Sequence, residues 1–302
     1  MGQTTAIEWC DSTLNLEMGC DGCELWTPKT GEKTCYSGNL TQVYAGNKGW
    51  PDSFDKPKLF PERLKEVEKW KDLTGADRPG KPWLNGLPRL IFLDDMGDTF
   101  TESLPIDWLA EHLPRLAALP HTIILLTKRA NRMLEFSKTH PFPKNFWLLV
   151  SVTSAANYNR IEQLLQVRGG GAFGVSYEPA WGRIDLTEWL RDAKLRWVIA
   201  GGSSGLTAKP AHPDWFRDVR DQCQRANCAY FFKQWGEFGP WSDHHKPYNS
   251  PGRVFVSGNG TVKRQGENNG GQDLRDFAIM ERVGKKAAGA TLDGREWREF
   301  PG

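Results

Sequence analysis

The 302-residue sequence has little net charge and no long apolar run. A formal net charge of +2 gives no strong case for binding nucleic acid or a membrane through overall charge. The longest apolar run, residues 122–127, is far shorter than the roughly 20 residues of a membrane-spanning helix, and it predicts a buried strand. The first residues are polar and lack the apolar core of a secretory signal. We therefore expect a cytoplasmic protein with no membrane partner.

Cysteine is also scarce, because the chain has only six, yet three of them fall close together as Cys20, Cys23 and Cys35. Thiols stay reduced in the cytosol, so clustered cysteines there indicate metal binding or catalysis rather than disulfides. A structural zinc site needs four ligands, and Cys10 could supply the fourth. An iron–sulfur cluster held by three thiolates would instead leave one iron open for a ligand. The remaining two cysteines, Cys223 and Cys228, are expected to be buried thiols.

From residue 89 onward, apolar strand patterns alternate with amphipathic helix patterns. This alternation predicts a parallel α/β sheet, either an incomplete TIM-type barrel or a doubly wound sheet. One further unit could precede the series, but residues 1–45 have an irregular pattern and residues 58–74 have helical spacing. The predicted strands are residues 89–95, 121–129, 145–153, 171–179, 195–202 and 229–236, and the helices between them are residues 106–119, 131–139, 157–167, 186–193 and 213–227.

Polar residues follow each of the six predicted strands. The carboxyl ends of parallel strands are where such sheets place their sites, so six in succession favour one shared site over six solvated strand ends. These residues favour the barrel: a partial (β/α)6 TIM-type barrel over residues 1–239, with a cysteine loop at residues 10–36. Residues 240–302 are expected to form a polar extension that covers the barrel and contains a hairpin near residues 254–262. The strand-end residues are Asp94, Asp95, Thr127, Lys128, Arg129, Ser151, Thr153, Ser176, Glu178, Gly201, Gly202, Ser203, Lys233 and Gln234.

Several motifs occur in an order that resembles a known family. They are IEWCDSTLN, the three cysteines ending in Cys35-Tyr36, FLDDMGDTF, LLTKRANRM, VSVTS, SYEPAWGRIDL, VIAGGSSG, HPDWFRDVRDQC, FFKQWGEF and LDGREWREFP. Together they resemble the phage-type three-cysteine-motif protein family, which is similar to a divergent branch of the radical S-adenosylmethionine (radical SAM) enzymes near spore photoproduct lyase. The resemblance covers nearly the whole chain.

The resemblance implies a 4Fe-4S cluster bound by Cys20, Cys23 and Cys35, with S-adenosylmethionine on the open iron. It implies an enzyme that generates a 5′-deoxyadenosyl radical and rearranges or otherwise modifies a thymidine-derived base in phage DNA, as an isomerase or lyase. The expected partners are DNA or a modified nucleotide and a reductase that donates electrons to a monomeric protein in the infected bacterial cytoplasm. The cysteine spacing differs from the usual Cys-x3-Cys-x2-Cys, so a zinc-stabilised nucleic-acid-binding protein without catalysis stays open as an alternative.

Roles for individual residues follow from their chemistry and from the resemblance. Lys128 suits a carboxylate or phosphate, and Glu178 suits an amine or a sugar hydroxyl, so these two are the predicted catalytic-site residues. Asp98 stands where radical enzymes hold the amino group of the cofactor. The predicted cofactor-binding residues are Tyr36, Asp98, Ser151, Thr153, Gly201 and Gly202.

Overall fold

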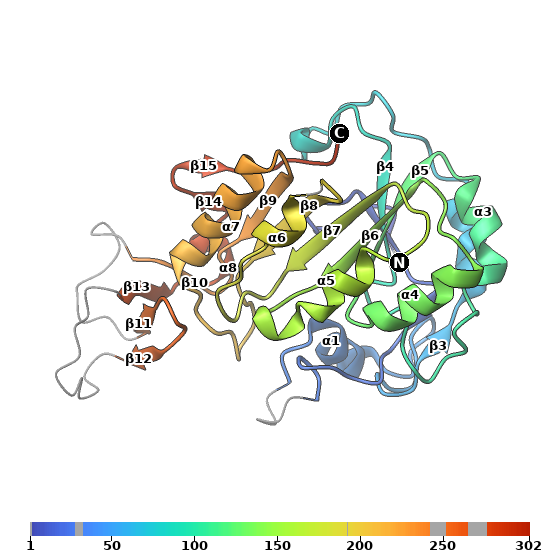
Figure 1. Cartoon of the computed structure of the whole chain (residues 1–302). Helices are drawn as coiled ribbons and strands as arrows, with labels where there is room; N and C mark the ends of the chain where they lie inside the picture. The colour runs from blue at the N-terminus through green and yellow to red at the C-terminus, as the bar shows by residue number, and fades with distance from the viewer. Residues whose placement is uncertain (1, 28–32, 192, 242–251, 265–276) are drawn as a thin grey trace. The chain divides into compact units, whose positions relative to one another are not determined.

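The computed structural model shows a mixed α/β protein (Figure 1). It describes residues 2–27, 33–191, 193–241, 252–264 and 277–302, so parts of the predicted cysteine loop and of the predicted extension lie outside the described residues. The chain forms two compact units. Unit 1 comprises residues 1–151 and 159–175, and unit 2 comprises residues 152–158 and 176–302. No helix among the described residues is long and apolar enough to cross a membrane.

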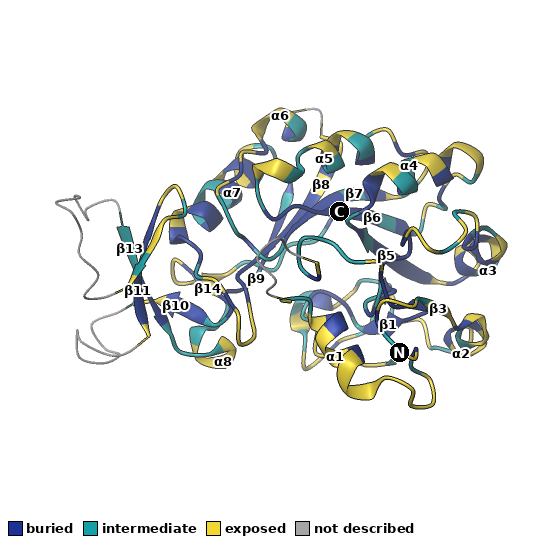
Figure 2. Ribbon diagram, turned by 90° about the horizontal axis from the view of Figure 1, so that it is seen from below, coloured by how far each residue is buried: buried dark blue, intermediate teal, exposed yellow. Residues whose placement is uncertain are grey.

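Parallel strands form the centre of unit 1, where β1, β4, β5 and β6 pair in that order. Leu14 of β1 lies opposite Leu93 of β4, which lies opposite Leu125 of β5. Nearly all residues of these strands are buried, because both faces of a parallel sheet are covered, and this explains their continuous apolar runs. Figure 2 shows β5 and β6 mainly in the colour of buried residues. The bounds are β1 Ser12–Leu14, β4 Arg89–Leu93, β5 His121–Thr127 and β6 Phe146–Ser151.

The first 70 residues differ from the sequence prediction in two places. Residues 1–45 are not irregular throughout, because β1 pairs with β4 and a helix, α1 (Tyr36–Tyr44), follows Cys35. The helix predicted over residues 58–74 is wrong in length. Residues 58–59 form β3 (Lys58–Leu59), which pairs with β2 (Glu17–Met18), and Pro61 then opens a short helical segment that ends with α2 (Leu64–Val67). This short segment buries Leu64 and Val67 fully.

The other predicted elements of unit 1 are present, most of them with shorter bounds. Pro114 occupies the first turn of α3 (Leu113–Ala117), where its missing N–H is not needed, and it therefore divides the predicted helix 106–119. Helix α4 (Ala130–Thr139) follows β5, and α5 (Asn159–Leu164) follows β6.

Unit 2 contains a parallel strand pair and a separate antiparallel sheet. Strand β8 (Leu195–Gly201) pairs with β9 (Ala229–Gln234), with α6 (Thr187–Leu190) before β8 and α7 (Pro213–Arg225) between the two strands. The predicted hairpin is confirmed, because β11 (Arg253–Ser257) pairs with β12 (Val262–Arg264). The remaining elements of this unit are β10 Phe238–Pro240, β13 Phe277–Arg282, α8 Lys285–Ala288, β14 Thr291–Leu292 and β15 Arg295–Glu296.

The parallel strands belong to one seven-stranded sheet with the order β1-β4-β5-β6-β7-β8-β9, where β7 is Ala172–Tyr177. All six strands predicted from residue 89 onward are present, and β1 supplies the additional unit before them. The α/β class is thus confirmed. The last residues of the chain run beside β9, since the Phe232 amide donates to the Trp297 carbonyl at 2.9 Å.

Candidate functional site

The three clustered cysteines lie together in unit 1. Cys20 packs with Trp26 and Phe54 in a small apolar cluster, and Cys35 packs against the same cluster. Cys23 is close enough to both other cysteines for their charges to affect titration. Among the described residues, no group of three or more His, Cys, Asp or Glu side chains stands in ligating positions for a metal ion. The thiols are therefore neighbours rather than a formed ligand set.

Each of the three sulfurs accepts a hydrogen bond from a nitrogen donor. The Cys20 Sγ accepts from Arg129 Nη1 at 3.3 Å, the Cys23 Sγ from the amide of Leu25 at 3.4 Å, and the Cys35 Sγ from the amide of Gly38 at 3.5 Å. Donors of this kind stabilise the thiolate over the thiol, and they tune metal groups that are bound through sulfur. These three donors thus act in favour of the thiolate at each sulfur.

Burial opposes that charge in the protein without metal. Burial, together with the nearby Asp98 carboxylate, raises the pKa of Cys20 to about 12, although Arg129 acts in the opposite direction. Burial also raises the pKa of Cys23, although the nearby Lys128 ammonium acts in the opposite direction. Because only thiolates bind metal, loading this site must release protons, and the bound cation must offset the buried negative charge.

Arg129, directly after β5, links the cysteine loop to the strand ends. Its guanidinium donates to Cys20 Sγ, to the Gly22 carbonyl at 2.8 Å and to Asp98 Oδ2 at 3.1 Å. Asp98 also accepts from Thr127 Oγ1 at 2.6 Å and from the amides of Phe100 and Lys128 at 3.1 Å. These four bonds match the four lone-pair sites of a carboxylate, and all four donors belong to the chain itself.

A second ion pair holds the loop near Cys23. Two guanidinium nitrogens of Arg160, in α5, donate to the two carboxylate oxygens of Glu24 at 2.9 and 3.0 Å. Arg160 also donates to the Ser151 carbonyl at 2.8 Å. Burial raises the pKa of Glu24, but the Arg160 pair outweighs burial and lowers it overall. The cysteine loop is therefore fixed to the carboxyl ends of both β5 and β6.

The two aspartates after β4 connect that strand to the segment before Cys20. Asp94 Oδ1 accepts from the amides of Leu16 and Glu17 at 2.8 and 2.9 Å. The hydroxyl of Tyr36 donates to the Asp95 carbonyl at 2.5 Å, which joins α1 to the same turn. Burial raises the pKa of Asp94 to about 7. Glu17 is fully buried, and this burial raises the pKa of its carboxyl group well above the usual value.

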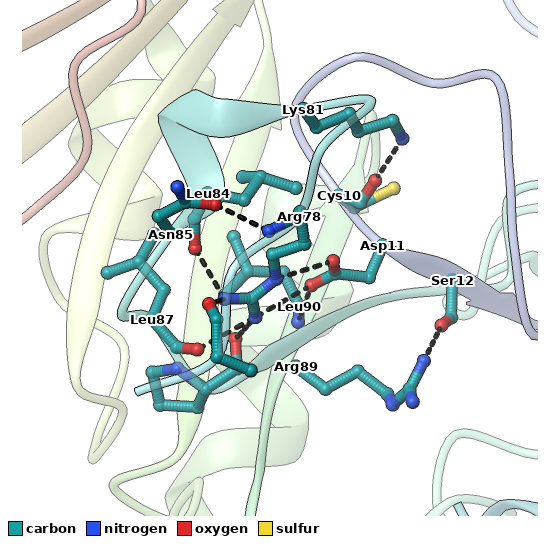
Figure 3. Close-up of polar contacts among 12 residues, drawn as sticks. Cys10, Asp11, Ser12, Arg78, Lys81, Leu84, Asn85, Leu87, Arg89 and Leu90 are labelled. Atoms are coloured by element: carbon teal, nitrogen blue, oxygen red, sulfur yellow. Dashed lines mark hydrogen bonds and ion pairs between the residues drawn. The ribbon is translucent and has the colours of Figure 1, made fainter. Parts of the chain in front are cut away.

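Cys10 lies at the other end of β1. It precedes that strand, at the edge where β4 begins, whereas Cys20 follows it. Its carbonyl accepts from Lys81 Nζ at 2.6 Å, and the adjacent Asp11 pairs with Arg78 at 3.0 Å (Figure 3). Asp11 also accepts from the amide of Leu90 at 2.8 Å, near the start of β4. Cys10 thus stands before β1 in the chain, whereas the three other N-terminal cysteines follow that strand.

The other predicted site residues divide between the units. Ser151 ends β6 in unit 1. In unit 2, the hydroxyl and amide of Thr153 donate to Asn157 Oδ1 at 2.9 and 3.0 Å, which is a turn-forming pattern. Glu178 pairs with Lys233 at 2.8 Å, and both side chains are largely buried at 18% exposure.

Packing in unit 2 explains why glycine occupies positions 201 and 202, both predicted to bind the cofactor. A Cβ on Gly202 would lie 1.8 Å from the Trp235 carbonyl oxygen, and one on Gly201 would lie 3.2 Å from the Glu178 carboxyl. Gly202 therefore permits a close approach of two backbone segments, whereas Gly201 makes room for Glu178.

Sequence reasoning missed Glu17, Glu24 and Arg160. Glu24 could have been found from its position, because an acidic side chain directly after a clustered cysteine needs an opposite charge nearby. Arg160 carried no such signal, since it lies within an ordinary helical pattern.

Comparison with protein-family models matches residues 4–301 to a family described as "Protein of unknown function (DUF5131)". Comparison with curated proteins found no match, and neither did comparison with solved structures.

Proposed function

The chain belongs to the DUF5131 family, and we propose that it is a radical SAM enzyme with a 4Fe-4S cluster bound by Cys20, Cys23 and Cys35. The observation that carries the proposal is the meeting of three thiols beyond the carboxyl ends of parallel strands, each with its own N–H donor. The strand order is compatible with a partial (β/α)6 barrel, which we include in the proposal.

The donor set fits such a cluster. Thiolates bind iron–sulfur clusters, and three of them leave one iron for a further ligand. When bound, the cluster and S-adenosylmethionine supply a 5′-deoxyadenosyl radical that abstracts hydrogen from a substrate. The chain's own part is to hold the sulfurs, through Arg129 at Cys20 and through the Glu24–Arg160 pair beside Cys23. Lys128, whose charge acts on Cys23, is placed to meet an anionic group nearby.

The substrate class in this proposal is a thymidine-derived base, in DNA or in a nucleotide, rearranged or otherwise modified in phage-infected bacteria. It is supported by the resemblance of the sequence motifs. A base in duplex DNA would need to leave the stack to reach a buried site. Deuterium-labelled thymidine, offered as a free nucleotide and within an oligonucleotide, tests this part. Deuterium in the released 5′-deoxyadenosine identifies the substrate form, and its absence from both rejects the substrate class.

Metal analysis separates the radical enzyme from the zinc-binding alternative. Anaerobically purified and reconstituted protein is expected to hold about four irons, and dithionite with S-adenosylmethionine should then yield 5′-deoxyadenosine. Cys20→Ala should lose the iron, whereas Cys10→Ala, at the opposite end of β1, should keep it. Stoichiometric zinc in place of iron, lost equally from both variants, would show that the chain is a four-cysteine zinc protein.

A further inference from the structure

Helix α1 exposes its large apolar side chains and buries its small ones. Ser37, Gly38 and Thr41 face inward, whereas Leu40 and Val43 are 39% and 71% exposed. Tyr36 and Tyr44, on the same stripe, are 54% and 42% exposed. Positions 36, 40, 43 and 44 share one side of a helix. Of the seven large apolar side chains that are exposed among the described residues, four therefore lie on this one stripe. Figure 2 shows the exposed colour along α1.

The same helix begins at a proposed cluster ligand. Cys35 is its N-cap, and the Cys35 sulfur accepts from the amide of Gly38. Gly38 is required because a Cβ there would lie 2.3 Å from the ring of Trp26, which packs with Cys20. The exposed stripe is thus the outer side of an element whose inner side contacts the thiols.

The chain around the stripe carries a small excess of positive charge. Between residues 33 and 58 the exposed charged side chains are Lys33, Lys48, Lys56, Lys58, Asp52 and Asp55, an excess of two positive charges. Lys48 lies in the turn that directly follows α1, where Trp50 stacks on Tyr44 with ring centroids 4.9 Å apart. An exposed stripe that mixes aliphatic and aromatic side chains, such as Leu40, Val43 and Tyr44, is typical of a protein contact surface.

We propose that the α1 stripe (Tyr36, Leu40, Val43 and Tyr44) is the docking surface for the electron donor, a small acidic protein that carries a flavin or an iron–sulfur cluster. This inference rests on the proposed function. One electron passes from the reduced donor to the cluster bound behind α1. The donor is oxidised by one electron and the cluster is reduced by one, with no bond or proton transferred. The apolar stripe supplies the contact, and the lysines attract the acidic partner and orient it.

The test compares reduction of the reconstituted cluster by two reductants. Reduced flavodoxin serves as the acidic protein donor and dithionite as a small reductant that needs no docking surface. In Val43→Glu, we expect the second-order rate with flavodoxin to fall about tenfold or more, because a charge enters the contact. Lys48→Glu should slow the same reaction, and its rate should depend less on salt. Reduction by dithionite should be unchanged in both variants.

Leu206→Glu is the matched control, because Leu206 is 96% exposed and lies in unit 2. It should reduce at the wild-type rate with both reductants. The docking proposal would be overturned if wild type and Val43→Glu were reduced by flavodoxin at the same rate. It would also be overturned if Val43→Glu slowed reduction by dithionite as much as reduction by flavodoxin. A wild-type dimer that Val43→Glu converts to monomer, with flavodoxin rates unchanged, would assign the stripe to a second copy and overturn it too. A protein without iron would instead contradict the proposed function itself.

Discussion

Removal of the Arg129 guanidinium should destabilise the protein even without bound metal. Arg129 is 8% exposed and joins Cys20, Gly22 and Asp98. Burial alone would lower its pKa, but Asp98 and Cys20 raise it well above the usual value. Loss of one partner from a buried ion pair costs about 3–5 kcal/mol, because the other charge stays buried. Asp98 keeps three of its four hydrogen bonds, so we expect about 3 kcal/mol for Arg129→Met.

That cost corresponds to a fall in Tm of about 6–12 °C for a domain of 150–250 residues. Calorimetry of the metal-free protein, prepared anaerobically, measures it. Arg115→Met is the control, because Arg115 pairs with Glu68 at 2.7 Å but both side chains are about 40% exposed. Such a solvent-exposed pair contributes little to stability. Equal Tm values for the two variants would refute the view that Arg129 fixes the cysteine loop to β5.

Three further predictions concern pH and packing. Because the folded protein holds the Asp94 proton up to about pH 7, the free energy of unfolding should fall as pH rises from about 4 to about 7, by up to roughly 4 kcal/mol. Urea titrations showing higher stability at pH 8 than at pH 5 would contradict this. Gly38→Val should destabilise by about 1–3 kcal/mol, since its Cβ would meet Trp26, and an unchanged urea midpoint would reject that contact. Arg78→Met should cost about 3–5 kcal/mol by leaving Asp11 buried without its partner, whereas an exposed-site change, Lys138→Met, should have little effect in the same titration.

The strands could be predicted because their signal is local. Runs such as residues 89–93 and 121–127 are apolar throughout, and a parallel sheet buried on both faces requires that. Strand β1 was harder, because Ser12-Thr13-Leu14 is only partly apolar. Its burial depends on a partner almost 80 residues away. The helical spacing at residues 58–74 failed because pairing of β3 with β2 and the position of Pro61 override local propensity.

The candidate site could be predicted only in part, for the same physical reason. Three cysteines stand out in any chain that has few, but what surrounds each sulfur depends on tertiary contacts. Asp98 illustrates this, because its sequence position fits a cofactor ligand, whereas its oxygens are filled by β5 and the residues after it. The orientation of helix α1 could not be predicted from the sequence either. The helix buries Ser37 and Gly38 rather than Leu40 and Val43, and contacts with Trp26 and the cysteine loop determine this.

The pairing of β1 with β4 also sets the order of events during synthesis. Leu14 cannot reach its register until Leu93 has been made, 79 residues later. At about 5–20 residues per second, a ribosome takes roughly 4–16 seconds to add that length. For that interval the segment with Cys20, Cys23 and Cys35 has no strand behind it, and its thiols are open to solvent. Oxidants and metal ions therefore have freer access to these sulfurs during translation than in the folded protein, where Cys20 is buried and Cys23 and Cys35 are half-buried.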